Sequence, residues 1–258
     1  YEKKFWKEIK SIKEKLKLWI NYKRQEKCFK SASGIIFISK YAKKFVTNEL
    51  EIADIPNKVV HHGVSSLFIT KKKENFKSQN RINRNFKFIY VSTVHVYKNQ
   101  WNVIEAIWKL RKSGIKISLT LVGPIIYPPS GIKLYTKMKE KDPDGKFIKY
   151  IPEVPHEKLP KYYSSHDAVI YASSCENMPN ILIESMASGL PIACSDKEPM
   201  PEFLKTGGYY FDADSIDSIM QAVIKLLKDK NPTKKTNQNI AEVEKLKWVE
   251  TSKKTFRN

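Results

Sequence analysis

Two glutamates, Glu176 and Glu184, are separated by seven residues and flank a segment that predicts the start of a helix. Asn180 is a residue type that caps helices, an apolar triplet follows it, and Gly189 is a residue type that ends them. The free N–H groups of a helix start can hold a phosphate, and carboxylates can accept hydrogen bonds from sugar hydroxyls. The segment therefore indicates a site for a ligand with both groups, although two carboxylates could also work as a general acid and base.

A second polar segment, residues 92–99, lies between a predicted strand and a predicted helix and contains Ser92, Thr93 and Lys98. Ligands of open parallel sheets bind outside the carboxyl ends of the strands, so we expect these hydroxyls and this ammonium to face one crevice with the glutamates. Lys98 could neutralise a diphosphate, or it could be a solvated lysine at a helix start.

Strand and helix signals alternate along the chain. Predicted strands cover residues 35–39, 58–64, 86–91, 115–122, 146–151, 168–172, 192–194 and 209–211. Predicted helices cover residues 2–27, 41–50, 100–111, 132–140, 156–164, 180–188, 216–228 and 239–256, and a polar segment at 231–237 interrupts the pattern. Five or six βα units in a row predict an α/β fold with a doubly wound parallel sheet.

The 258 residues carry a formal net charge of +20, and 41% of them are apolar, which is enough for a substantial core. Such a charge predicts anionic partners, namely nucleotide phosphates, acidic lipid headgroups or nucleic acid. Because lysines are spread over the whole chain, a general lysine enrichment explains the charge equally well. No recognition motif or concentrated basic stripe accompanies it, so we expect no nucleic-acid partner.

The predicted helix at 2–27 has an apolar stripe opposite a lysine-rich face. It could lie on an anionic membrane surface, or its stripe could pack on the protein's own domain. No run approaches the roughly 18 apolar residues of a membrane span. Three widely spaced cysteines without a Cys-x-x-Cys pair argue against a disulfide framework, so we expect a cytoplasmic protein.

Several reaction classes lack their signatures in this chain. There is no Gly-x-Gly-x-x-Gly or Gly-x-x-x-x-Gly-Lys phosphate loop and no Gly-x-Ser-x-Gly elbow, which argues against nicotinamide-dinucleotide, P-loop and serine-hydrolase chemistry. The five histidines do not stand at metal-ligand spacing with acids, so we expect no metal site.

From about residue 28 to residue 258 the chain resembles the retaining glycosyltransferases of family 4, which have the two-domain GT-B architecture. The most specific motif is the Glu176-x7-Glu184 signature with the following run Ser185–Pro191. Weaker matches in the same order lie at 33–41, 62–64, 88–99, 150–160, 201–203 and 243–248.

The resemblance implies a GT-B fold in which a complete C-terminal Rossmann-like sheet follows the last part of an N-terminal Rossmann-like domain, truncated at its start. On this basis residues 1–70 are the remnant of the acceptor-binding N-terminal domain and residues 71–85 are a linker. Residues 86–230 are the nucleotide-sugar-binding domain, and residues 231–258 form a tail helix that crosses back to the N-terminal domain.

The resemblance also implies roles for single residues. Glu176 would bind donor sugar hydroxyls, Glu184 would accept hydrogen bonds from the ribose, and Lys98 would stabilise the departing diphosphate as a catalytic cation. No metal would be needed, because a cation and a helix start neutralise that charge. The donor-binding residues implied besides Glu184 are Ser92, Thr93, Val154, Met178, Pro179, Asn180, Ile181 and Leu182, with Val154 at the base.

The chain departs from the family at Thr93, where the family has a phosphate-binding Arg, and at Ser92, which stands in a Gly position. This Ser-Thr loop resembles a branch of bacterial O-antigen or capsule mannosyl- and rhamnosyltransferases. The implied function is retaining hexosyl transfer from a GDP- or UDP-linked sugar to a glycan or lipid-linked acceptor, at the cytoplasmic face of the inner membrane. The alternative is a non-catalytic or incomplete nucleotide-sugar-binding domain.

Overall fold

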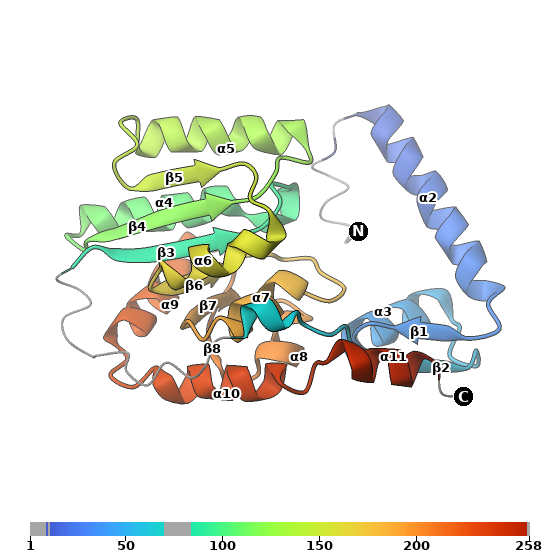
Figure 1. The fold of residues 1–258 in the computed structure, drawn as a ribbon. Helices are drawn as coiled ribbons and strands as arrows, with labels where there is room; N and C mark the ends of the chain where they lie inside the picture. Colours follow the sequence, from blue (N-terminus) through green and yellow to red (C-terminus); the bar gives the residue numbers. More distant parts are fainter. Residues whose placement is uncertain (1–8, 10, 70–83, 257–258) are drawn as a thin grey trace.

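The computed structural model describes residue 9, residues 11–69 and residues 84–256. Over these residues the chain forms one large and one small parallel sheet, which lie at opposite ends of the molecule in Figure 1. The predicted linker at 71–85 lies outside the described residues except for its last two positions.

The larger sheet has six strands in the order β5-β4-β3-β6-β7-β8, and every pairing is parallel. The strands are β3 (Phe86–Val91), β4 (Ile117–Val122), β5 (Ile148–Ile151), β6 (Ala168–Tyr171), β7 (Ile192–Ser195) and β8 (Gly208–Phe211). The chain builds outward from β3 to β5, then returns to place β6 on the other side of β3. The predicted doubly wound parallel sheet is confirmed, and its order reverses between β3 and β6, where such sheets bind ligands.

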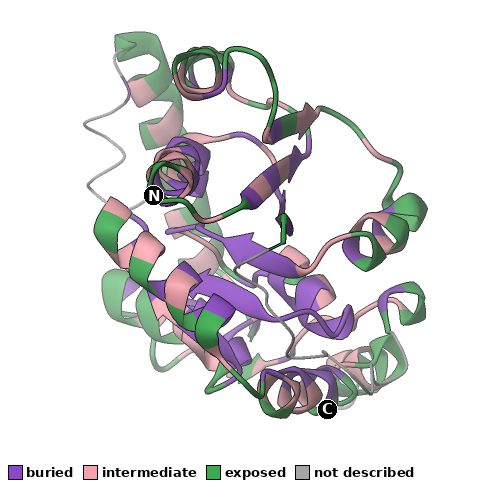
Figure 2. Ribbon diagram, turned by 90° about the vertical axis from the view of Figure 1, so that its left-hand side faces the viewer, coloured by how far each residue is buried: buried purple, intermediate pink, exposed green. Residues whose placement is uncertain are grey.

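Helices cover this sheet on both sides, as Figure 2 shows by the buried strands at its centre. All four residues of β6 and of β7 are buried, which explains why these strands are continuous apolar runs in the sequence. The helix α9 (Ile216–Lys228) buries Ile219, Val223 and Leu226 at helical spacing and packs against α4 (Gln100–Lys112) and the strands β7 and β8.

The remaining helices of the larger unit follow its strands, with α5 packed beside α4 and α10 packed beside α7. They are α5 (Pro128–Lys141), α6 (Leu159–Ser164), α7 (Asn180–Ala187), α8 (Met200–Leu204) and α10 (Thr233–Val243), with short 3₁₀ turns at η1 (Ser66–Phe68), η2 (Val96–Lys98) and η3 (His156–Lys158). The five-residue helix α8 was not predicted, because so short an element carries little periodicity.

The prediction of one helix over 239–256 is wrong. Two helices, α10 and α11 (Trp248–Phe256), occupy this region, and the polar segment 231–237 forms the first turns of α10. The polar residues at the start of α10 join the helix because it packs on the larger unit, where the buried Asn239 amide donates to the Gly207 carbonyl at 3.0 Å. The chain then turns before α11, which contacts the smaller sheet through a 2.8 Å hydrogen bond from Thr251 Oγ1 to the His61 carbonyl.

The smaller sheet pairs β1 (Ile35–Phe37) with β2 (Asn57–Val59), with α3 (Lys40–Leu50) between them in the chain. Its core is a separate cluster of buried apolar residues: Ile35, Phe37, Ala42, Leu50 and Ile52. Figure 1 shows α11 lying beside this unit. The strand predicted at 58–64 is shorter than expected and ends at Val59, where pairing with β1 ends.

The first described helix, α2 (Ile12–Lys30), begins where Ser11 accepts a capping hydrogen bond, and the earlier part of the predicted helix at 2–27 lies mostly outside the described residues. No residue of α2 is buried, and Ile12 and Trp19 are 85% and 52% exposed. These stripe residues are exposed, whereas Ile9 is buried and Phe29, near the end of α2, stacks on Phe37 of the smaller unit with ring centroids 6.3 Å apart. The stripe therefore packs on the protein only in part. No helix in the described part of the chain has the length and apolar character needed to cross a membrane.

Gly123 lies at the carboxyl end of β4, where it packs closely against the end of β3. Its φ is +135°, and an added Cβ would lie 2.2 Å from the Ser92 carbonyl oxygen. Gly145 has a φ of +64° with no atom within 4 Å of such a Cβ. We expect Gly145→Ala to lower the free energy of unfolding by about 1 kcal/mol.

Gly123→Ala should cost several times more, because it adds a backbone clash to the conformational penalty. Urea denaturation of both variants measures the difference. Equal losses would mean that the ends of β3 and β4 separate freely, which contradicts the tight packing described here.

Candidate functional site

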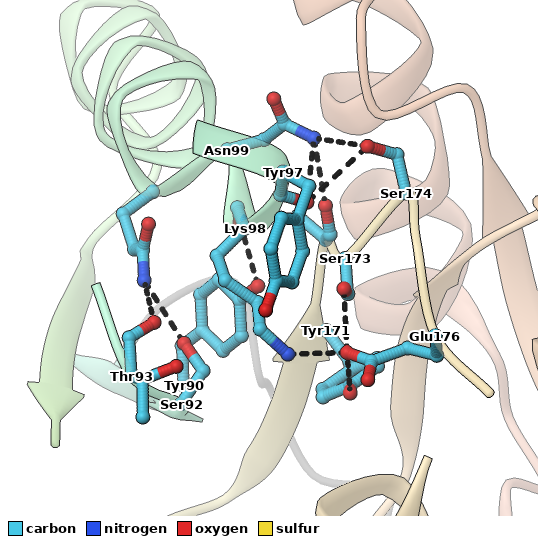
Figure 3. A network of polar contacts seen from close by, with 12 residues as sticks. Tyr90, Ser92, Thr93, Tyr97, Lys98, Asn99, Tyr171, Ser173, Ser174 and Glu176 are labelled. Carbon is cyan, nitrogen blue, oxygen red and sulfur yellow. Dashed lines mark hydrogen bonds and ion pairs between the residues drawn. The ribbon is translucent and has the colours of Figure 1, made fainter. Parts of the chain in front are cut away.

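The two predicted polar segments leave neighbouring strands at the point where the strand order reverses. Residues 92–99 follow β3, and residues 172–179 follow β6, which pairs with β3. Their carboxyl ends therefore meet at one edge of the sheet, as expected for a ligand site in this fold. Figure 3 shows the polar side chains of both segments converging there.

Lys98 and Glu176 form an ion pair across this edge. The Lys98 ammonium donates to Oε1 of Glu176, and their side chains are only 5% and 15% exposed. The same oxygen accepts hydrogen bonds from the Tyr171 hydroxyl at 2.7 Å and from the Ser173 hydroxyl at 2.6 Å. Three donors thus fix one oxygen of Glu176, so this carboxylate is rigidly oriented (Figure 3).

Tyr171 was not predicted as a site residue. It is the last residue of β6, and its ring is almost fully buried. Burial raises the pKa of the Tyr171 phenol well above its usual range, so the hydroxyl stays protonated and remains a donor to Glu176 at neutral pH. The available signal was a tyrosine at the end of an otherwise aliphatic strand.

Asn99 connects the loop after β3 to the loop after β6 by hydrogen bonds, and no role was predicted for it. It adopts a left-handed conformation with a φ of 53°. Its side-chain amide donates to the Ala172 carbonyl at 3.1 Å and to the Ser174 hydroxyl at 3.2 Å. The Tyr90 hydroxyl also donates to the Lys98 carbonyl at 2.6 Å. These hydrogen bonds fix the backbone of the two loops that carry Lys98 and Glu176.

Ser92 and Thr93 lie in this edge but differ in accessibility. Ser92 is buried, and its hydroxyl accepts a 2.9 Å hydrogen bond from the side-chain amide of Gln100. The same amide donates to the Thr93 carbonyl at 2.9 Å, while the Thr93 residue is half-buried. Ser92 accepts a hydrogen bond that supports the loop from inside, and its contact with a donor stays a prediction.

The helix between the two glutamates begins at Asn180, but Asn180 is not its N-cap. Pro179 holds the N-cap position, because its carbonyl accepts the first helical hydrogen bond, from the Ile183 N–H at 3.0 Å. The Asn180 N–H donates to the Met178 carbonyl at 2.9 Å. The next two N–H groups, of Ile181 and Leu182, precede that first bond and so have no acceptor within α7.

Side chains near the helix start are mostly buried. Leu182 and Met178 are buried, so Leu182 can offer a ligand only its backbone N–H. The sulfur of Met178 accepts from the His62 N–H at 3.2 Å, and Pro179 is buried beside it. Gly189 follows the helix in a left-handed conformation with a φ of 68°, as its predicted role as helix terminator requires.

Glu184 lies one turn further along α7 and has a different environment. Its carboxylate is 2.7 Å from Nε2 of His156, and its side chain is 14% exposed. Burial raises the pKa of Glu184, and the hydrogen bond from His156 partly opposes this rise. The His156 ring packs 4.9 Å from the Phe68 ring. His156 was missed, although it lies in the predicted base-contacting loop with the half-buried Val154.

The structure thus brings Lys98, from the loop after β3, together with Glu176, from the loop after β6. The start of α7 and Glu184 follow Glu176 in the chain. The two glutamates have separate partners, one a lysine and the other a histidine. Among the residues that the structure describes, no three His, Cys, Asp or Glu side chains are grouped as metal ligands would be.

The buried ion pair generates a prediction about stability. Glu176→Gln leaves the Lys98 ammonium without a counter-ion, which should lower the free energy of unfolding by about 3 kcal/mol. Adding Lys98→Met removes the unpaired cation, so the double variant should be more stable than Glu176→Gln alone. Urea denaturation of the single and double variants gives the coupling. Strictly additive losses would show that the two charges do not interact.

Comparison with known proteins identifies the family. The family model described as Glycosyl transferases group 1 matches residues 71–243. The chain is 24% identical over 170 residues to the O-antigen chain mannosyltransferase B of Escherichia coli, covering 65% of this chain and 44% of that protein. It is 24% identical over 148 residues to the amylovoran biosynthesis glycosyltransferase AmsK of Erwinia amylovora, covering 55% of this chain and 35% of that protein. The chain spans less than half the length of both relatives.

Solved glycosyltransferase structures share the fold. HepE of Anabaena, solved in complex with UDP and glucose, has a TM-score of 0.71 at 16% identity, covering 88% of this chain and 63% of that one. A glycosyltransferase from Rickettsia africae has a TM-score of 0.73 at 16% identity, covering 89% of this chain and 64% of that one. These likenesses confirm the GT-B fold class. The family model, which matches more than half of the chain, shows that the chain belongs to the glycosyl transferases group 1 family.

Proposed function

We propose that this chain binds a nucleotide-diphosphate sugar at the carboxyl edge of its larger sheet and takes part in transferring the sugar, with retention, as a member of glycosyltransferase family 4. The observation that carries the proposal is the buried Lys98–Glu176 pair beside the start of α7. Two neighbouring loops and the start of one helix would then supply a cation for a diphosphate, a carboxylate for sugar hydroxyls, and amides for a leaving group.

In this proposal Lys98 has two alternative partners. Without donor it pairs with Glu176, and with donor it binds the diphosphate, a stronger anion. Glu176 keeps its hydrogen bonds from Tyr171 and Ser173, which hold it oriented toward the sugar hydroxyls. The N–H groups of Ile181 and Leu182 add neutralising dipoles as the leaving diphosphate gains charge.

Glu184 and the loop before α6 would hold the nucleoside. Because Glu184 is bound by His156, its carboxylate is fixed in place while one oxygen stays available for ribose hydroxyls. Val154 lies two residues before His156, so the segment that would contact the base adjoins the group that would contact the ribose.

The donor and acceptor classes follow from chemistry and from the names of the relatives. We propose a GDP- or UDP-linked hexose as donor and no metal. We propose as acceptor a glycan or lipid-linked glycan of the cell surface, since the two relatives are named for O-antigen and amylovoran synthesis. A net charge of +20 fits contact with anionic lipid at the cytoplasmic face of the membrane.

Isothermal titration with GDP-mannose, UDP-glucose, UDP-galactose, dTDP-rhamnose and the free nucleotides tests the proposal. We expect at least one nucleotide sugar to bind. Glu184→Ala should weaken free nucleotide and nucleotide sugar alike, by about tenfold or more, because it removes a charged hydrogen-bond acceptor. Glu176→Gln should weaken only the nucleotide sugar.

Folded protein that binds none of these ligands would contradict the proposal. Binding without transfer or hydrolysis would favour the alternative, a non-catalytic nucleotide-sugar-binding domain. For an active protein, nuclear magnetic resonance of the first product formed reports its anomeric configuration and therefore tests retention.

The environment of Glu184 generates a pH prediction. Because burial raises its pKa, Glu184 becomes protonated at a higher pH than an exposed glutamate with a pKa of about 4.3. Nucleotide affinity should therefore begin to fall at a higher pH on acidification. His156→Ala removes the contact that lowers this pKa, so the fall should move to a still higher pH.

Titrations of free nucleotide from about pH 5 to pH 8 measure these profiles. Glu184→Gln is the matched control, since it keeps the side-chain shape and removes only the titration of Glu184. Identical profiles for the wild-type protein and Glu184→Gln would show that Glu184 does not contact the nucleotide as a carboxylate.

A further inference from the structure

The start of α3, in the smaller unit, contacts the loop that carries Glu176. Ser39 is fully buried and caps α3 by accepting from the Ala42 N–H at 3.0 Å. The same hydroxyl donates to the Asn177 carbonyl at 2.6 Å. Asn177 directly follows Glu176 in the chain, so one serine joins a helix of the smaller unit to the proposed donor loop.

Glu202, in α8 of the larger unit, holds the same end of α3 from another side. Its two carboxylate oxygens accept from the N–H groups of Lys40 and Tyr41 at 2.8 and 3.0 Å. Nε2 of His61 lies 3.2 Å from Oε1 of Glu202. A carboxylate that accepts two N–H groups at a helix start also complements the helix dipole, so this contact fixes where α3 begins.

The proposed donor loop, residues 172–179, is therefore held by hydrogen bonds at both of its ends. Its first residues are held from within the larger unit, where Asn99 binds the Ala172 carbonyl and the Ser174 hydroxyl. Its last residues are held from the smaller unit, by Ser39 at Asn177 and by the His62 N–H at the Met178 sulfur. Glu176 lies between these anchors.

We propose that Ser39 is a positioning residue for Glu176 and that Glu202 holds Ser39 in place, an inference that rests on the proposed donor site. The smaller unit then sets the affinity for the sugar part of the donor, although its α3 contributes no group to that part. Positioning matters most after the donor binds, because Lys98 then turns to the diphosphate and no longer restrains Glu176.

The proposal predicts different effects on two dissociation constants, that of free nucleotide and that of the nucleotide sugar. Free nucleotide would be held by Lys98, Glu184 and the amides of α7, which Ser39 does not touch. A nucleotide sugar adds contacts to Glu176, which do depend on Ser39. Loss of the Ser39 hydroxyl should therefore reduce the extra affinity that the sugar brings and leave the affinity for free nucleotide unchanged.

Ser39→Ala tests this, with Ser215→Ala as matched control. Ser215 also caps a helix, α9, by accepting from the Ser218 N–H at 3.2 Å, and α9 lies outside the proposed site. We expect Ser39→Ala to weaken the nucleotide sugar about tenfold and free nucleotide less than twofold. Ser215→Ala should change neither constant, and Ser39→Thr, which keeps the hydroxyl, should restore the wild-type ratio.

Equal weakening of both ligands by Ser39→Ala, or no weakening, would overturn the inference while the proposed function stands. Failure of the wild-type protein to bind any nucleotide sugar would instead overturn the proposed function. Amide hydrogen exchange at residues 176–178 needs no ligand and should be faster in Ser39→Ala than in Ser215→Ala. Glu202→Gln, which removes the charge facing α3, should accelerate the same amides, and unchanged exchange in both variants would contradict the positioning role.

Discussion

A buried lysine needs an anion beside it, and this requirement organises the carboxyl edge of the larger sheet. Lys98 lies in the turn η2 after β3, its side chain is almost inaccessible to water, and the Glu176 carboxylate balances its charge. The pair can form only because β3 and β6 are neighbours, and that adjacency follows from the reversal of strand order. A sheet wound in one direction alone would place these loops at separate positions along its edge.

The same constraint explains the polar residues around the pair. A salt bridge with little solvent is favourable only when its remaining hydrogen-bonding groups have partners. Tyr171 and Ser173 provide them for the carboxylate, and Tyr90 and Asn99 hold the backbone of both loops. These hydroxyl and amide groups lie near the ends of β3 and β6, where the backbone no longer pairs with a neighbouring strand. Side chains there provide the hydrogen bonds that the backbone groups would otherwise lack.

The sequence predicted the bounds of helices and strands better than it predicted which side chains contact one another. The bounds of β3 and α9 were predicted without error, since each has a strong apolar period and a clear end. The N-cap of α7 was not, because Pro179 supplies the first carbonyl and this depends on local backbone geometry. The residue types and their spacing indicated Glu176, Glu184 and Lys98 as site residues. They did not indicate the hydrogen-bond partners Tyr171 and His156, because neither residue stands in a motif that assigns it a role. Three-dimensional adjacency, unlike periodicity, leaves no local pattern.

The two glutamates differ in what a ligand would have to displace. In the proposed donor complex a diphosphate would separate Lys98 from Glu176, and one anion would replace another beside the same cation. The carboxylate would keep Tyr171 and Ser173 as donors, and a sugar hydroxyl would replace the donor that Lys98 withdraws. A free phosphate without a sugar would leave Glu176 with fewer partners. Coupling between the two charges therefore favours a ligand that carries an anion and hydroxyl groups together, over either alone.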